Sequence, residues 1–294
     1  MTLEELKGII DAAGGRENAL AYAEALLLKI QRLEATGQYE QLLKQLRGSR
    51  HPGDFRGRVL EVNFADQFLS SGQRLTYGVR QGMTGDIDFG LPCEGYDLCM
   101  EMKLLGQDQA TKEKEARQLA ELGVSKILLT DDTRDVARLQ LDLMQKGSTK
   151  KFNARPQDRC INLVAVDVSE LQLGCVDIGD CLLAAGGNPV AARHCHEAVL
   201  RPSIVGVFEQ IERDRMSSEQ RAWVDGVHSI ASPAGAPHPR DYIHGALFLF
   251  RKPDERAALS YTLSGAVVWN SALVSGDVAQ ALTHALERVI PRTK

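Results

Sequence analysis

The sequence lacks the short motifs that mark several large enzyme classes. It contains no glycine-rich phosphate loop of the GxxxxGKS/T or GxGxxG type and no GxSxG nucleophile motif. Its six cysteines include no CxxC pair, which argues against a zinc ribbon. The motifs therefore give no support for a nucleotide-binding loop, a serine hydrolase or a zinc-ribbon protein.

Long apolar runs are also missing. No run reaches the ~20 residues needed to cross a bilayer, and no signal peptide opens the chain. We therefore expect a cytoplasmic protein whose thiols are reduced. The net charge of −4 excludes a polycation, so any contact with nucleic acid depends on a local basic patch.

The chain is long enough for a large domain with an appendage. It has 294 residues, of which 44% are hydrophobic, so a sizeable core can be buried. Apolar residues recur at helical spacing over residues 2–46, and glycine and proline mark residues 48–53 as a linker. We expect a helical appendage over residues 1–50, serving as a cap or a dimerisation arm, and a main domain over residues 51–294.

The first element of the main domain is predicted to be a helix over residues 54–70. Asp54 is a plausible N-cap, and Leu60, Phe64 and Phe68 form an apolar stripe. Glu61 lies one position round from this stripe, at the edge of the buried face. An acid in that place either reaches water or has a chemical role, and the helix alone does not decide between them.

Two alternating segments follow and predict a hairpin. Residues 83–91 place Asp86 and Asp88 opposite the apolar face, and residues 96–105 do the same with Glu101 and Lys103. Residues 74–79 can add a strand before them.

The turn decides which aspartate faces Glu101. A two-residue turn at Glu94 and Gly95 puts Asp88 directly opposite, whereas a four-residue loop over residues 92–95 puts Asp86 there. Either turn gathers two carboxylates and an ammonium on one side of a sheet, which is costly without a partner.

Mg²⁺ is the natural partner for such a cluster. It is a hard cation that prefers oxygen ligands and is held by one or two carboxylates together with substrate phosphate. Asp88 or Asp86 and Glu101 are the expected ligands, and Glu61 can bind a second metal or a metal-bound water. Lys103 is expected to orient the attacking water or to stabilise developing negative charge.

The rest of the chain predicts a mixed α/β sheet. A charged helix is expected over residues 107–122 and strands over residues 126–130 and 161–168, so that helix, strand, strand, helix and strand follow one another. The main domain then has a core over residues 54–168 and a strand-rich part over residues 200–294. In that part, strands are expected over residues 203–208, 243–250 and 264–269, and a final helix over residues 276–289.

The segment GDIDF at residues 85–89, followed by CMEMK at residues 99–103, resembles the PD-(D/E)xK phosphodiesterase superfamily. The similarity covers about residues 54–130 and can be extended to residue 168. It implies a restriction endonuclease-like mixed sheet flanked by helices, with Asp88, Glu101 and Lys103 as the motif and Glu61 as the helix acid. It also implies an Mg²⁺-dependent endonuclease, with Mn²⁺ as a substitute, acting on DNA, with RNA not excluded, and a homodimer. The proline of the motif is absent here, which leaves Asp86 and Asp88 as alternative ligands.

Other residues give further candidates and rival hypotheses. The basic segment at residues 147–159 is expected to contact a nucleic-acid backbone through Lys150, Lys151, Arg155 and Arg159.

One rival hypothesis is a catalytically silent, nucleic-acid-binding or scaffolding relative of the same fold. Another is a small-molecule enzyme that uses a cluster of His238, Asp241 and His244. His194, Cys195 and His196 could bind a metal with Cys175 or Cys181, but buried thiols and surface histidines are the simpler interpretation.

Overall fold

The protein is described here by a computed structural model. It describes residues 1–13, 22–80, 85–106, 117–118, 121, 133–146, 151–152, 159–171, 176–187, 206–208, 217–218, 239–252 and 258–293. Within these residues, no helix is both long enough and apolar enough to span a membrane.

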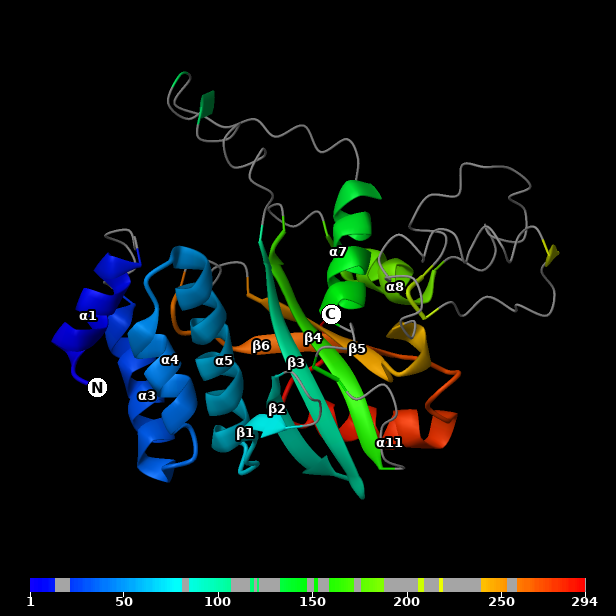
Figure 1. The fold of residues 1–294 in the computed structure, drawn as a ribbon, viewed down its shortest axis with the longest axis horizontal. Coiled ribbons are helices and arrows are strands. Elements are labelled where there is room, and N and C mark those ends of the chain that lie inside the picture. The colour runs from blue at the N-terminus through cyan, green and yellow to red at the C-terminus, as the bar shows by residue number, and fades with distance from the viewer. Residues whose placement is uncertain are drawn as a thin grey trace.

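A mixed sheet of six strands forms the centre of the molecule (Figure 1). The strands lie side by side in their chain order, with β1, β2 and β3 antiparallel, β3, β4 and β5 parallel, and β6 antiparallel to β5. Strand β4 is buried along almost its whole length, which explains its nearly continuous apolar sequence. The mixed α/β sheet predicted from the sequence is confirmed. The strands are β1 (Thr76–Arg80), β2 (Asp86–Cys93), β3 (Tyr96–Gly106), β4 (Cys160–Glu170), β5 (Gly245–Arg251) and β6 (Leu263–Trp269).

Helix α5 (Pro52–Ser70) packs against one face of the sheet, α3 (Ala23–Thr36) and α4 (Glu40–Gly48) pack against α5, and α1 (Leu3–Ala12) packs against α3 and α4 (Figure 1). The helices expected before residue 50 and after it are therefore present. The predicted N-cap at Asp54 is wrong, because α5 begins at Pro52 with His51 as its N-cap. Proline is well suited to this first position, since its φ is already helical and it has no N–H to satisfy. Asp54 lies in the first turn instead.

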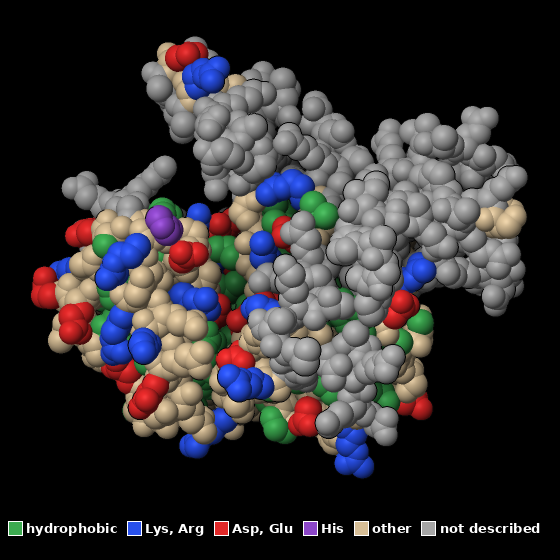
Figure 2. Space-filling model, in the orientation of Figure 1, with side chains coloured by type: hydrophobic (Ala, Val, Ile, Leu, Met, Phe, Trp, Pro, Cys, Tyr) green, Lys and Arg blue, Asp and Glu red, His purple; other side chains and the backbone are tan. Residues whose placement is uncertain are grey.

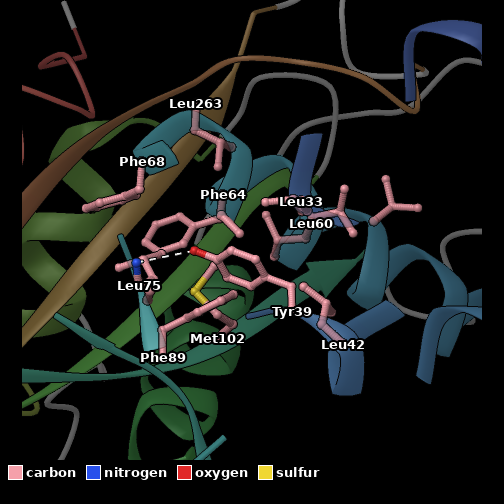
Figure 3. Packing of buried hydrophobic residues seen from close by; sticks show 14 of the residues in the cluster. Leu33, Tyr39, Leu42, Leu60, Phe64, Phe68, Leu75, Phe89, Met102 and Leu263 are labelled. Atoms are coloured by element: carbon pink, nitrogen blue, oxygen red, sulfur yellow. Dashed lines mark hydrogen bonds between the residues drawn. The ribbon is translucent and has the colours of Figure 1, made fainter. Parts of the chain in front are cut away.

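The N-terminal helices share one continuous hydrophobic cluster with α5 and the sheet (Figure 3). Tyr39 is fully buried in this cluster, and its hydroxyl accepts a hydrogen bond from the Leu75 backbone N–H at 3.3 Å. Phe64 of α5 contacts Phe89 of β2, with ring centroids 5.4 Å apart. The boundary expected at residue 51 stays a prediction, but no break in the core marks it among the residues described.

A second hydrophobic cluster covers the other face of the sheet, under α7 (Thr133–Lys146) and α8 (Ile178–Gly186). Neither helix was anticipated from the sequence. A short 3-10 helix, η4 (Pro239–Asp241), precedes β5, and α11 (Gly276–Glu287) packs its Leu282 and Leu286 into the first cluster.

The strand expected over residues 203–208 is wrong where the structure describes it. Gly206, Val207 and Phe208 form a turn. The N–H groups of Val207 and Phe208 donate to the carbonyls of Ala184 and Ala185, so they satisfy the C-terminal end of α8 instead of a sheet. The helix at residues 107–122 and the strand at residues 126–130 lie almost entirely outside the described residues, although residues 117, 118 and 121 are helical.

Candidate functional site

The turn between β2 and β3 consists of two residues, Glu94 and Gly95, and not of the four-residue loop that the sequence also allowed. Cys93 pairs with Tyr96, and both turn residues have positive φ, 51° at Glu94 and 80° at Gly95. Such a turn suits the right-handed twist of the two strands. Continuing the register one residue beyond the pair of Phe89 with Met100 places Asp88 opposite Glu101.

Asp86 is the first residue of β2, and its partner lies on β1. It pairs with Arg80 of β1, whose Nε lies 3.6 Å from the Asp86 carboxylate. Its side chain is 37% exposed. Asp88 is therefore the aspartate that the hairpin aligns with Glu101.

Asp88 and Glu101 lie next to each other at the end of the hairpin that is far from the turn. The Asp88 carboxylate accepts a hydrogen bond from the Met102 backbone N–H at 2.8 Å, so it occupies a place between the two strands. The Glu101 side chain is fully buried. The Lys151 Nζ donates to Glu101 Oε1 at 2.6 Å and lies 3.9 Å from Asp88 Oδ1.

Glu61 is the third carboxylate of this region, and α5 supplies its partner from the preceding turn. Arg58 Nη1 lies 2.7 Å from both Glu61 oxygens. The Tyr77 hydroxyl lies 2.9 Å from Glu61 Oε2 and 2.7 Å from Gln45 Oε1. Glu61 therefore belongs to a hydrogen-bonded cluster that joins α5 to β1 and α4.

The three carboxylates influence one another electrostatically. Burial raises the pKa of Asp88 to about 7, and the neighbouring charges of Glu101 and Glu61 add to the shift. Burial also raises the pKa of Glu61, against the opposing effect of Arg58. Burial lowers the pKa of Lys151, but Asp88, Glu101 and Glu61 more than offset that effect, so its pKa is raised and it is an ammonium at neutral pH.

A pocket of about 230 Å³ opens onto this cluster. Basic and acidic groups share its wall, together with two glutamines from α4. On the face drawn in Figure 2, acidic and basic side chains are interspersed over the described N-terminal helices. The lining residues are Gln41, Gln45, Arg58, Tyr77, Gly78, Asp86, Ile87, Asp88 and Lys151.

Lys103 does not join this group. Alternation along β3 places it on the same side of the strand as Glu101, but its Nζ lies 3.1 Å from the Asp142 carboxylate of α7. It is not among the described residues that line the pocket. The structure thus brings Asp88 and Glu101 together near Glu61, and it pairs Lys103 elsewhere.

Sequence reasoning missed two residues of this cluster, Arg58 and Tyr77, and it assigned a different role to a third, Lys151. Arg58 carries a signal that could have been used, because it precedes Glu61 by one helical turn and can form an i,i+3 ion pair. Tyr77 carries no such signal. Lys151 was expected to contact a nucleic-acid backbone, and it lies against the carboxylates instead.

The donor set suits a hard divalent cation. The Lys151 ammonium lies 3.9 Å from an Asp88 oxygen and 2.6 Å from a Glu101 oxygen, so one cation already lies near both carboxylates. Mg²⁺ commonly takes only one or two protein carboxylates, with water and phosphate as the other ligands. Within the part of the chain that the structure describes, no group of three or more His, Cys, Asp or Glu side chains is arranged to hold a metal. The carboxylates of Asp88 and Glu101 could hold a cation as its two protein ligands.

The remaining candidates lie apart from this site. His244 is buried, and its Nδ1 accepts a hydrogen bond from the Asn162 backbone N–H at 3.0 Å. Burial lowers the pKa of His244 to about 4, so it is a neutral acceptor between strands. Asp241 is exposed, and Cys181 is a buried residue of α8 in the second hydrophobic cluster. Lys150, Arg155, His238, Cys175 and residues 194–196 lie outside the described residues, and Arg159 is exposed at the start of β4.

Three comparisons with known proteins complete the description of the site. No family model, no curated protein and no solved structure matches the chain.

Proposed function

We propose that this protein is a metal-dependent endonuclease of the PD-(D/E)xK type, which hydrolyses phosphodiester bonds of DNA. One observation carries the proposal: the hairpin aligns Asp88 with Glu101 next to Glu61, at a pocket that also contains the cations Arg58 and Lys151. Clustered buried carboxylates are costly in a protein that does not use them, so such a group is a candidate reactive site.

The order of the elements supports a restriction endonuclease-like core. Helix α5 with Glu61 is followed, after β1, by β2 with Asp88, β3 with Glu101, helix α7 and the parallel strand β4. The sequence predicted elements of the same kinds in this order, but with the helix over residues 107–122 and the strand over residues 126–130, which lie mostly outside the described residues. The six-stranded mixed sheet accommodates it, with α5 and α7 on opposite faces.

Mg²⁺, with Mn²⁺ as a substitute, is the proposed metal, and Asp88 and Glu101 are its proposed ligands. When bound, it would act as a Lewis acid that polarises the phosphate and offsets charge in an in-line displacement. The chain keeps both ligands in place, since Met102 N–H holds Asp88 and strands on both sides hold Glu101. Arg58, fixed by Glu61 at the wall of the pocket, is suited to bind a phosphate oxygen.

The proposed substrate is DNA, and RNA has the same phosphodiester chemistry. Lys151 and Arg159 are the described members of the basic segment that would contact it, with Lys150 and Arg155 as the other two proposed contacts. A cytoplasmic location and a homodimer are part of the same proposal.

A catalytically silent relative of the same fold is the second candidate function. The observation that favours it is the ion pair between Lys103 and Asp142, which keeps the lysine of the motif away from the carboxylates. Such a protein would bind nucleic acid or act as a scaffold without cleaving.

Cleavage assays on supercoiled, linear and single-stranded DNA, and on RNA, test the proposal. Each substrate is incubated with Mg²⁺, with Mn²⁺ and with EDTA. The wild type should cleave only with metal, and Glu101→Gln should lose ~10²–10³-fold in rate, the loss typical of removing one preorganised charge-stabilising group. Glu94→Gln is the matched control, because Glu94 is an exposed glutamate on the turn of the same hairpin.

Two results would contradict the proposal. Cleavage that persists both in EDTA and in Glu101→Gln would exclude the metal site. Binding of DNA and of Mn²⁺ without cleavage of any substrate would favour the silent relative.

A further inference from the structure

Two lysines could serve a phosphodiesterase site at this position, and their surroundings differ. Lys103 has the spacing of the motif, but its ammonium is paired with Asp142 at 3.1 Å, away from the pocket. Lys151 is distant in sequence, but its ammonium lies 2.6 Å from Glu101 and 3.9 Å from Asp88.

The ion pairs of Lys151 differ from surface ion pairs because the two acids that it contacts are buried. The Glu101 side chain is 0% exposed and the Asp88 side chain 13% exposed, whereas Lys151 is 35% exposed and lines the pocket. One side of Lys151 thus neutralises buried acids, and the other side can be reached by a solute. A charge-assisted contact to a buried carboxylate is stronger than one at the surface, because water screens it less.

The same two carboxylates are the proposed metal ligands. The Lys151 ammonium therefore lies where a divalent cation would bind, and the two cations compete for the same oxygens. A cation that displaces the ammonium from Glu101 leaves it at the wall of the pocket that Arg58 also lines, with its charge available for an anion.

We propose that Lys151, and not Lys103, is the lysine that binds the substrate phosphate at this site, and that it neutralises Asp88 and Glu101 until a divalent cation replaces it. This inference rests on the proposed function. It gives Lys151, which lies outside the Glu-x-Lys triplet, the role that the resemblance implies for Lys103. It also makes a prediction that a purely structural lysine does not share: removal of Lys151 strengthens metal binding while it weakens catalysis.

The test compares Lys151→Met, Lys151→Arg and Lys103→Met with the wild type. Mn²⁺ affinity is measured by titration calorimetry in the absence of DNA, and metal-dependent cleavage is measured separately. Lys151→Met should bind Mn²⁺ about 10-fold more tightly and cleave ~10²-fold more slowly, the range that a lost charge-assisted contact gives. Lys103→Met should keep the wild-type Mn²⁺ affinity, and Lys151→Arg should keep an affinity close to that of the wild type.

The outcomes separate this inference from the proposed function. If the wild type binds Mn²⁺ and cleaves, but Lys103→Met loses cleavage while Lys151→Met keeps it, the inference is wrong and the proposed function stands. Weaker Mn²⁺ binding by a folded Lys151→Met also overturns the inference. A wild type that neither binds Mn²⁺ nor cleaves overturns the proposed function, and the inference falls with it.

Discussion

At the scale of single residues, the buried acids of this protein are neutralised to different degrees. Asp66 has the Arg32 guanidinium on both oxygens at 2.8 Å, and Asp167 has the Arg251 guanidinium at 2.6 Å. The ion pair of Asp88 is a longer contact, 3.9 Å to Lys151, and burial raises its pKa together with the charges of Glu101 and Glu61. Ionised Asp88 therefore destabilises the folded state, as expected for a residue placed for chemistry.

Asp88→Asn should stabilise the metal-free protein at pH 8 by about 1–3 kcal/mol more than at pH 5. The folded-state pKa of Asp88, about 7, is above the ordinary aspartate value of 3.8. Between these values the folded protein holds the proton that the unfolded chain releases, so stability falls as the pH rises toward 7. Asparagine removes the charge and keeps an oxygen for the Met102 N–H.

Urea denaturation of wild type and variant at both pH values measures this effect. Asp97→Asn is the control, since Asp97 is exposed on the same hairpin and should show no pH-dependent gain. An equal effect of Asp88→Asn at pH 5 and pH 8 would show that ionised Asp88 is not destabilising.

At the scale of the elements, the β2–β3 hairpin determines whether the site exists. Side chains alternate with a period of two along a strand, so a slip of one residue would move Glu101 to the face opposite Asp88. The turn prevents this slip because its two residues adopt positive φ, which glycine tolerates at position 95.

Gly95→Ala should reduce the free energy of unfolding by roughly 1 kcal/mol. No heavy atom lies within 4 Å of the added Cβ, so the cost comes from the backbone at φ +80° and not from a clash. Gly57→Ala is the matched control in the interior of α5, where the added Cβ is also in open space and φ is not positive. It should stabilise the protein by about 0.5–1 kcal/mol. Equal effects of the two substitutions in urea denaturation would refute a backbone origin.

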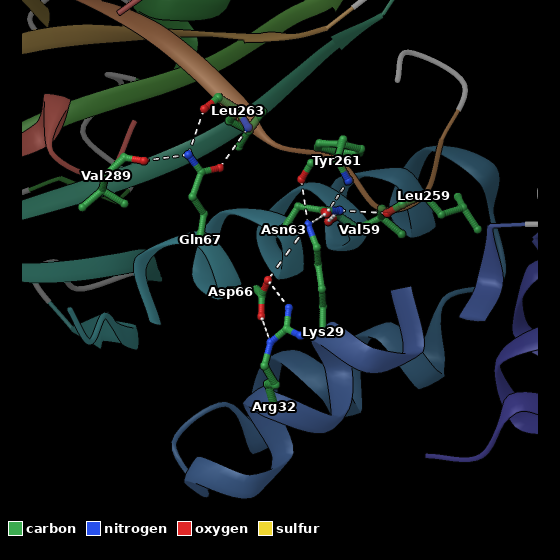
Figure 4. A network of polar contacts seen from close by, with 10 residues as sticks. All are labelled: Lys29, Arg32, Val59, Asn63, Asp66, Gln67, Leu259, Tyr261, Leu263 and Val289. Carbon is green, nitrogen blue, oxygen red and sulfur yellow. Dashed lines mark hydrogen bonds and ion pairs between the residues drawn. The ribbon is translucent and has the colours of Figure 1, made fainter. Parts of the chain in front are cut away.

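At the scale of the whole molecule, Asn63 of α5 ties the N-terminal helices to the C-terminal part of the chain (Figure 4). Its amide nitrogen donates to the carbonyls of Val59 and Leu259, at 2.8 and 2.9 Å. Its oxygen accepts from Lys29 Nζ at 2.7 Å and from Tyr261 N–H at 2.9 Å. Residues far apart in the chain thus meet at one fully buried side chain.

Asn63→Ala should destabilise the protein by about 2–4 kcal/mol, because it leaves buried polar groups of three segments without their partner. Hydrogen exchange should show that α3 and the segment around Tyr261 lose protection together. Gln31→Ala, which removes an exposed amide of α3, should change stability by less than about 0.5 kcal/mol. Loss of protection confined to α5 would contradict the link between the two ends of the chain.

Much of the fold could be predicted from local patterns. Helical periodicity identified the N-terminal helices, and alternation identified β2, β3 and the strands after them. The failures have different causes. The turn at Val207 and Phe208 depends on hydrogen bonds to the end of α8, which an apolar pattern does not encode. The start of α5 at Pro52 has a local signal, the preference of proline for the first helical position, which was not used. Helices α7 and α8 went unrecognised although α7 has an apolar stripe of Val136, Leu139 and Leu143.

The sequence by itself determined that one of two aspartates, Asp86 or Asp88, faces Glu101 across a hairpin, because strand alternation is a local property of the chain. Only the structure decided in favour of Asp88, through its two-residue turn, and only the tertiary structure decided which cations meet these acids. Lys151 reaches Glu101 across 50 positions of sequence, and Lys103 turns to Asp142 of a helix on the other face from α5. A long, flexible lysine side chain forms an ion pair with whichever acid the packing brings near it. That acid is fixed only when separate helices and strands pack together.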